Sequence, residues 1–188
     1  LLGLGHQLDE LTLGIDPRQL FGAHGTALGM ALRVQIRDRE QVLGRAATVE
    51  DLEKITLVNL ERSKATSGED LYRARQAFES IGATMEQHFE RYDVILSPVT
   101  SSLTPKLGLL SLDQPWDSYA HQAMGSAGFT VIANVSGQPA ISLPLGQSDD
   151  GLPVGMMFTA RLGGEDVLLR LASQLEQAHP WAARRATL

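Results

Sequence analysis

The chain has 188 residues, enough for one domain with a sizeable core, and its apolar content of 43% is that of an ordinary globular protein. A net charge of −6 without a basic stripe argues against a nucleic-acid partner. The absence of cysteine excludes disulfides and thiolate metal sites, and no apolar run approaches the roughly 18 residues of a membrane span, so we expect a cytoplasmic protein without a membrane partner.

The sequence opens on Leu1-Leu2-Gly3-Leu4, inside an apolar element and without a methionine. We therefore expect a fragment or a processed product of a longer polypeptide. No linker, repeat or low-complexity segment interrupts residues 1–188, which predicts a single domain. Within it, residues 1 to about 90 carry helical patterns, and residues 91–188 carry the patterns typical of strands.

A helix is predicted to begin at Asp16-Pro17, with the aspartate as N-cap and the proline in the first turn, where its missing N–H costs nothing. Behind this start, glycine and alanine recur at helical spacing between residues 22 and 31. This small-residue face predicts close packing against another helix, although each glycine lowers helix propensity by about 1 kcal/mol relative to alanine.

A serine or threonine followed three residues later by an acidic residue is typical of a capped helix start. The pattern occurs at Thr48–Asp51 and again at Ser67–Asp70, so we expect a helix to begin at each. The second start is followed by the clearest amphipathic pattern in the chain, which predicts a helix with one core-facing stripe. The apolar residues of this stripe are Leu71, Ala74, Phe78, Ile81, Met85 and Phe89.

The periodicity changes in the second half of the chain. Residues 93–97 form a short apolar run closed by Pro98, which favours a buried strand of a parallel or mixed sheet. Residues 99–117 are rich in Ser, Thr, Pro and Gly and have no sustained periodicity; a loop of this length in a compact domain is often functional. Residues 118–128 are predicted to form one helix.

Two further strands are predicted, over residues 140–145 and 154–160, with a turn between them. Pro144 removes a hydrogen-bond donor, which places the first strand at an edge, beside a bulge or near its own end. The second strand is apolar on both faces, so we expect it to be covered on both sides. A last helix is predicted to begin at Glu165-Asp166. This order of elements predicts an α/β fold in which helices flank a mixed sheet.

Residues suited to catalysis are sparse. The five histidines are scattered and none forms a two-histidine zinc pair, so no metal site is predicted. Neither a phosphate-binding loop nor a dinucleotide-binding glycine motif is present, so no cofactor is predicted. The serine pair Ser101-Ser102 lies in the long loop but lacks a glycine frame that would free backbone N–H groups for an oxyanion. The residues alone indicate no catalytic centre.

Five segments carry motifs in a fixed order. They are Tyr92–Pro98, Pro105–Gly108, Asn134–Pro144, Gly151–Gly155 and Leu168–Trp181. Together they resemble the C-terminal portion of the amidase signature family, with Ser97 where threonine is usual. Residues 138–145 and 180–185 look most like the branch of that family that includes the nylon-oligomer (6-aminohexanoate cyclic dimer) hydrolases.

The resemblance implies the C-terminal part of the amidase signature fold. It also implies hydrolysis of carbon–nitrogen bonds through an acyl-enzyme, by a serine that a second serine and a lysine activate. In the family these groups lie in a Gly/Ser-rich segment of the N-terminal half, and no such segment occurs here. The lysines Lys54, Lys64 and Lys106 have no matching context. We therefore expect scaffold and pocket walls from this chain, and no turnover by the chain alone.

The resemblance also gives this segment a share of the substrate pocket. Thr100, Asn134 and Gln138 lie near the predicted strand ends, where α/β sheets open crevices for ligands. They are the predicted polar contacts to a small-molecule amide substrate in the complete enzyme. The alternative for Asn134 and Gln138 is that each satisfies backbone groups at a helix end and a turn.

A second hypothesis comes from another class of function. On it, the chain is a non-catalytic binding or interaction module that kept the same scaffold and lost the chemistry. Under either hypothesis, the absence of an N-terminal half would leave unpaired strand edges and an uncovered apolar face, which favour self-association. We therefore expect a homo-oligomer.

Overall fold

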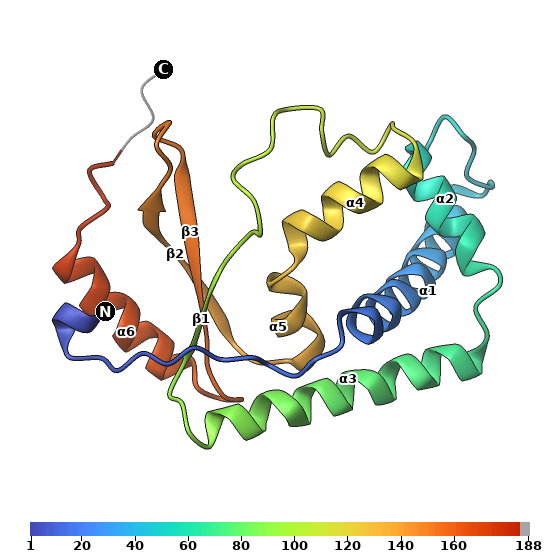
Figure 1. The fold of residues 1–188 in the computed structure, drawn as a ribbon. Helices are drawn as coiled ribbons and strands as arrows, with labels where there is room; N and C mark the ends of the chain where they lie inside the picture. Colours follow the sequence, from blue (N-terminus) through green and yellow to red (C-terminus); the bar gives the residue numbers. More distant parts are fainter. Residues whose placement is uncertain (185–188) are drawn as a thin grey trace.

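The computed structural model describes residues 1–184 and contains a helical part and a strand-containing part (Figure 1). One helix, α6, lies on one side of a small sheet, and the helices α1 to α5 lie on the other. The elements are η1 (Leu2–Leu4), α1 (Pro17–Leu43), α2 (Lys54–Ser63), α3 (Gly68–Phe89), β1 (Ile95–Pro98), α4 (Trp116–Ala127), α5 (Thr130–Ser136), β2 (Ala140–Gln147), β3 (Pro153–Thr159) and α6 (Glu165–Ala178). The α/β class and the helical N-terminal part are confirmed.

Helix α1 begins where the sequence predicts. The Asp16 carboxylate accepts a hydrogen bond from the Arg18 backbone N–H, and Pro17 occupies the first helical position. The small-residue face brings α1 close to the end of α2, because a Cβ added at Gly29 would lie 3.4 Å from the Ser63 Cβ. The predicted close packing is thus confirmed at this glycine.

The two capping patterns have different outcomes. Ser67 and Asp70 form a reciprocal capping box that starts α3, as predicted. The predicted helix start at Thr48 is wrong, because Thr48 and Asp51 bond to each other across a turn and α2 begins only at Lys54. Arg45 explains the difference: its guanidinium binds both carboxylate oxygens of Asp51, at 2.8 Å each, and holds that side chain in the turn.

The predicted stripe of α3 faces the helical core. Its residues Ala74, Ile81 and Met85 are buried. A cluster of buried apolar side chains joins α1, α3 and α5. It consists of Leu20, Ile81, Val131 and Val135. Packing of amphipathic faces, rather than helix propensity, therefore holds these helices together.

The sheet joins the three predicted strands in the order β1-β3-β2. Both pairs are antiparallel, so the expectation of a parallel or mixed sheet is not met within these strands. The reason is local for β2 and β3, since a short turn connects them and forces a hairpin. Strand β1 lies at the edge and is half-buried on alternate residues, so its predicted burial is also incorrect.

Strand β2 has the predicted irregularity at its proline. The register between β2 and β3 shifts between Leu143 and Gly146, which brackets Pro144, and β2 lies at the second edge of the sheet. Strand β3 lies in the centre. Its residues Met157, Phe158 and Thr159 are buried, which confirms cover on both faces.

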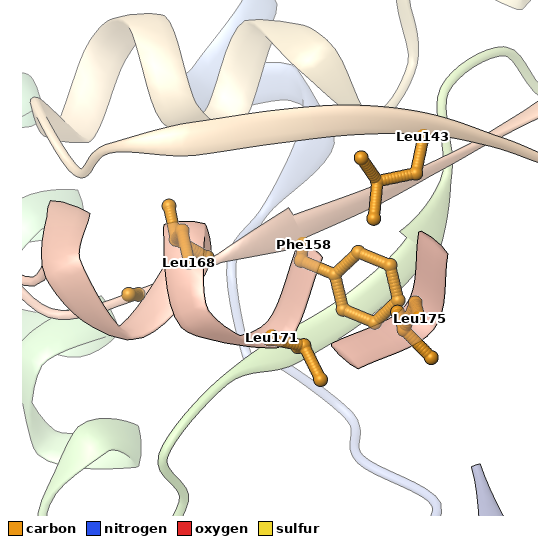
Figure 2. Close-up of a cluster of buried hydrophobic side chains, with 6 residues drawn as sticks. Leu143, Phe158, Leu168, Leu171 and Leu175 are labelled. Atoms are coloured by element: carbon orange, nitrogen blue, oxygen red, sulfur yellow. The ribbon is translucent and has the colours of Figure 1, made fainter. Parts of the chain in front are cut away.

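The core between the sheet and α6 is apolar and closely packed (Figure 2). The Phe158 ring, which is 0% exposed, lies among leucines of β2 and α6. The cluster comprises Leu143, Phe158, Ala160, Leu168, Leu171 and Leu175. The first residues of the chain pack here too, because Leu1 contacts this cluster and His6 hydrogen-bonds to Gln174 of α6 at 2.9 Å.

Two further features bear on function. Residues 99–115 contain neither helix nor strand, which confirms the long loop, and α4 follows it from Trp116, slightly before the predicted start. Among the described residues, no helix is both long and apolar enough to cross a membrane.

Candidate functional site

The sheet has two chemically different faces. Phe158 and Leu143 point into the α6 core, so the residues that alternate with them, Met157 and Ser142, point to the opposite face. The strand register aligns Ser97 of β1 with Met157, and Met157 with Ser142 of β2. The exposed Ser142 thus lies with Ser97 and the buried Met157 on the face of the sheet opposite α6.

The long loop leaves β1 at the border of this face. The Val99 backbone N–H donates to the Gly155 carbonyl at 3.0 Å, which extends the β1–β3 pairing by one residue. The approach is close, because a Cβ at Gly155 would lie 2.8 Å from Val99 Cγ2 and 3.1 Å from Ser142 Oγ. Further along, the Ser101 hydroxyl donates to the Gly125 carbonyl near the end of α4. The start of the loop is therefore fixed between the sheet and α4.

Two of the three predicted site residues reach solvent. Thr100 is exposed in the loop, where its hydroxyl donates to the Ser102 carbonyl at 2.8 Å. Asn134 is exposed on α5 and its side-chain amide donates to the Thr130 carbonyl at 3.1 Å. Asn134 thus satisfies a backbone group of its own helix, while its carbonyl oxygen takes part in no hydrogen bond within the described residues.

The third predicted residue, Gln138, is 4% exposed. Its Nε2 donates to Glu86 Oε1 of α3 at 2.9 Å, and the Leu162 backbone N–H donates to the same oxygen at 3.0 Å. Gln138 Oε1 is buried and has no hydrogen-bond partner in the described part of the chain. One carboxylate therefore holds the turn before β2 and the loop after β3 against α3.

Sequence reasoning did not single out Glu86 or the sheet face opposite α6. The helical pattern places Glu86 on the polar side of α3, although it directly follows the buried Met85 and so lies at the border of the stripe. Gly82, one turn earlier, marks the same contact, since a Cβ there would lie 3.3 Å from the Ser136 carbonyl oxygen. A glycine and a glutamate four residues apart beside a buried stripe could have indicated a close approach of another segment.

The structure does not bring the three predicted residues into direct contact with one another. Two surface pockets lie elsewhere: one of about 460 Å³ between α2 and the start of α4, and one of about 440 Å³ between α1 and α2. The first is lined by Lys54, Leu57, Val58, Asp113, Gln114, Pro115 and Trp116. Neither pocket includes Thr100, Asn134 or Gln138.

The described residues form no nucleophile–base pair of a hydrolase. Within residues 1–184, Ser67 is the serine whose hydroxyl donates to a carboxylate, that of Asp70, and both residues belong to the capping box of α3. No group of three or more His, Asp or Glu side chains in this range could hold a metal ion. The arrangement can shape and support a pocket, but it cannot by itself activate a hydroxyl for attack.

The perturbed pKa values belong to structural groups. The Arg45 guanidinium and Thr48 hold the pKa of Asp51 far below its usual range. Hydrogen bonds from Ser67 lower the pKa of Asp70 at the cap of α3. Burial lowers the pKa of His24 in α1. Asp51 and Asp70 hold a turn and a helix start, and His24 is perturbed by burial alone, so none of these groups indicates a reactive centre.

A family model of amidases matches residues 20–169, which is more than half of the chain. The chain belongs to the amidase family. The amidase chain is 33% identical over its full length to a 6-aminohexanoate-cyclic-dimer hydrolase of Paenarthrobacter ureafaciens, of which it covers 40%. It is 38% identical, over 95% of its length, to a putative amidase AmiC of Mycobacterium leprae, of which it covers 38%.

Solved structures agree with these relatives. The structure of a 6-aminohexanoate cyclic dimer hydrolase matches 98% of the amidase chain with a TM-score of 0.89 at 32% identity, and the chain covers 40% of it. A bacterial aryl acylamidase of the amidase signature family matches with a TM-score of 0.73 at 20% identity, which shows the shared fold alone. The amidase chain therefore spans about 40% of the length of the relatives it matches.

Proposed function

We propose that the chain is a C-terminal segment of a larger amidase signature hydrolase that cleaves carbon–nitrogen bonds. In this role it supplies scaffold and substrate-pocket walls. The observation that carries the proposal is the match along 98% of this chain to only 40% of a cyclic dimer hydrolase. The segment has its own hydrophobic core but spans less than half of the relatives' length. Both features are expected of a part that supports an active site without containing all of it.

The reacting groups of the proposed enzyme lie outside this chain. The family resemblance assigns them to two serines and a lysine in a Gly/Ser-rich segment, which has no counterpart among residues 1–188. Two of the three lysines are engaged in ion pairs, Lys54 with Asp113 and Lys64 with Glu61, so they do not resemble unpaired bases. We expect no amide hydrolysis by the chain alone.

The proposed pocket wall includes the sheet face opposite α6 and the loop that begins at Val99. Thr100 in this loop and Asn134 on α5 each have an exposed polar side chain and are the proposed substrate contacts. Gln138 is the third, with an Oε1 that lacks a partner and could accept a donor when the fold is complete. The geometry also favours Ser142, whose exposed hydroxyl lies on the same face.

The test combines this chain with a complementary segment, which we define as the part of the Paenarthrobacter ureafaciens hydrolase that this chain does not match. The two polypeptides are co-expressed and purified through a tag on this chain. We expect the complex to hydrolyse the 6-aminohexanoate cyclic dimer, and each polypeptide alone to be inactive. A stable complex without activity, or turnover by the isolated chain, would contradict the proposed function.

Substitutions in the same complex test the pocket contacts. Asn134→Ala and Thr100→Ala are expected to raise KM by several-fold with little change in the unfolding midpoint, because their side chains reach solvent. Ala133→Ser, which adds a hydroxyl beside Asn134 on α5, is the matched control and should leave KM unchanged. If every variant has the same KM as the unsubstituted complex, neither Thr100 nor Asn134 contacts the substrate.

Assembly and location remain proposals. The isolated chain is expected to form a dimer or higher oligomer in the cytoplasm, because its sheet has an unpaired edge and its loop exposes leucines. A clean monomer by light scattering at micromolar concentration would contradict this. The alternative, a non-catalytic binding module, predicts that no complementary segment restores hydrolysis.

A further inference from the structure

The larger of the two surface pockets lies where α4 begins beside α2 (Figure 1). Its apolar lining includes Leu57 and Val58 of α2 and Trp116 of α4. Lys54 and Asp113 are its charged residues. The volume of about 460 Å³ lies within the roughly 300–1,000 Å³ of small-molecule sites, which are mostly apolar and contain a few polar groups. The pocket therefore has the size and the composition of a small-molecule site.

Several contacts hold the walls of this pocket in place. The Arg62 guanidinium of α2 lies 4.4 Å from the centre of the Trp116 ring, a cation–π contact that holds the indole against α2. The backbone N–H of the buried Ile55 donates to the Leu112 carbonyl at 2.9 Å and ties the start of α2 to the loop before α4. In that loop the Gln114 side-chain amide donates to two backbone carbonyls, at 2.8 Å each. Walls that are fixed before binding lose less entropy when a ligand enters.

The two charged residues place a hydrogen-bond donor next to an acceptor. The Lys54 Nζ lies 3.8 Å from the Asp113 Oδ1, beyond hydrogen-bond length, and both side chains are exposed, so this ion pair is weak. The Lys54 Nζ also donates to the Asp113 backbone carbonyl, at 3.4 Å. An ammonium and a carboxylate each form several hydrogen bonds, so both groups retain capacity for a ligand.

A donor next to an acceptor matches one edge of an amide group. In a primary amide, and in a lactam whose ring holds the amide cis, the C=O and an N–H point to the same side. In an ordinary trans amide they point to opposite sides. The same-side edge can accept a hydrogen bond from Lys54 while it donates one to Asp113. Asp113 would repel a carboxylate ligand, and Lys54 would repel an ammonium ligand.

We infer that this pocket binds a small neutral ligand with an aliphatic body and a primary or cis amide. The amide bridges the Lys54 ammonium and the Asp113 carboxylate. The aliphatic body packs on Leu57, Val58 and Trp116, where burial removes apolar surface from water. The lining of the pocket alone selects this class of ligand, independently of the proposed amidase function.

Tryptophan fluorescence tests the ligand class. Trp116 and Trp181 are the two tryptophans of the chain, so in a Trp181→Phe background the emission reports on the pocket. Hexanamide and caprolactam are expected to change this emission and to bind at least about threefold more tightly than N-methylpentanamide, a trans amide of the same size. Hexanoate and hexylammonium should likewise bind more weakly than hexanamide. Equal affinities for hexanamide and N-methylpentanamide, or tighter binding of either ion, would overturn the assignment.

Substitutions at the charged pair test the location of the site. Lys54→Met keeps the aliphatic stem but removes the donor, and Asp113→Ala removes the acceptor. Each is expected to weaken hexanamide binding at least about threefold. Lys106→Met changes an exposed lysine outside the pocket lining and is the control that should leave the affinity unchanged.

Saturation-transfer NMR of hexanamide provides a second measure of binding, and circular dichroism verifies that each variant is folded. Unchanged affinity in both Lys54→Met and Asp113→Ala would contradict the bridging role of the pair. The absence of hexanamide binding by both fluorescence and NMR would reject the site altogether.

The complex with the complementary segment separates the pocket from the proposed function. The weaker binding of hexanamide to Lys54→Met is expected to persist in this complex. If the complementary segment abolishes the Lys54-dependent binding, it fills the pocket, and the assignment of a ligand site fails. Lys54-dependent binding in a complex that does not hydrolyse the cyclic dimer would retain the pocket and reject the proposed function.

Discussion

At the scale of single residues, Glu86 joins three segments of the chain that are far apart in sequence. Its Oε1 accepts from Gln138 Nε2 and from the Leu162 N–H, so α3, the turn before β2 and the loop after β3 meet at one atom. The helical pattern places Glu86 on the polar face of α3, because such a pattern reports spacing and not the neighbours that tertiary packing supplies. Its bonding partners lie 52 and 76 residues away in sequence.

Removal of this carboxylate leaves two N–H donors without an acceptor. Glu86→Ala is therefore expected to lower the free energy of unfolding by about 1–3 kcal/mol, measured by urea denaturation. Glu86→Gln retains an acceptor oxygen and should cost less. Glu79→Ala changes an exposed glutamate of the same helix and should stay within about 0.5 kcal/mol of the parent chain. Equal stability of Glu86→Ala and Glu79→Ala would contradict this account.

A pH dependence follows from His24. Burial lowers its pKa in the folded chain below the ordinary value of 6.5, so just below pH 6.5 the unfolded chain binds more protons than the folded one. The free energy of unfolding is expected to fall as the pH decreases from about 6.5 toward the folded pKa, and His24→Gln should remove this part of the slope. An identical slope in the two proteins between pH 7 and pH 5 would show that His24 does not contribute.

At the scale of elements, local rules predicted the starts of α1 and α3 because their caps use side chains next to the helix. They failed at Thr48 because Arg45, outside the capping pattern, takes the Asp51 carboxylate into a turn. Strand existence was also predictable from short apolar runs. Strand pairing was not, since the order β1-β3-β2 depends on contacts between segments about 60 residues apart.

The two capping patterns provide a matched pair of substitutions. Ser67→Ala removes the side chain that caps α3 and is expected to lower the free energy of unfolding by about 0.5–2 kcal/mol. Thr48→Ala changes the same pattern in an exposed turn and should cost no more than about 0.5 kcal/mol. Denaturant titration of both variants measures the difference. A larger cost at Thr48 than at Ser67 would contradict the assignment of the helix start.

Gly155 allows the end of β1 to approach β3. Gly155→Ala would place a Cβ 2.8 Å from the stiff Val99 side chain, so we expect a loss of about 1–3 kcal/mol in unfolding free energy. Gly25→Ala is the control, because no atom lies within 4 Å of an added Cβ in α1 and alanine favours the helix by about 1 kcal/mol. An unchanged free energy of unfolding for Gly155→Ala would mean that the Val99 side chain does not pack against β3 at Gly155.

At the scale of the whole molecule, the two faces of the sheet differ. The α6 core packs on one face, whereas the other carries the buried Met157, an exposed Ser142 and a long loop at its border. Sequence motifs indicated the family and the long loop, because motif order and loop composition can both be read along the sequence. They could not indicate which predicted residues reach solvent, and Gln138 proved buried against Glu86 while Asn134 and Thr100 are exposed.

The location of the nucleophile tests the central claim most directly. In the complex with the complementary segment, Ser101→Ala and Ser102→Ala together are expected to leave kcat for the cyclic dimer within about tenfold of the unsubstituted complex. Loss of a serine nucleophile would lower kcat by about 10⁶-fold, so the two cases are far apart. Retained turnover is the predicted result. Abolished turnover in a complex that still assembles would mean that this chain carries the reacting serine, and would contradict the account.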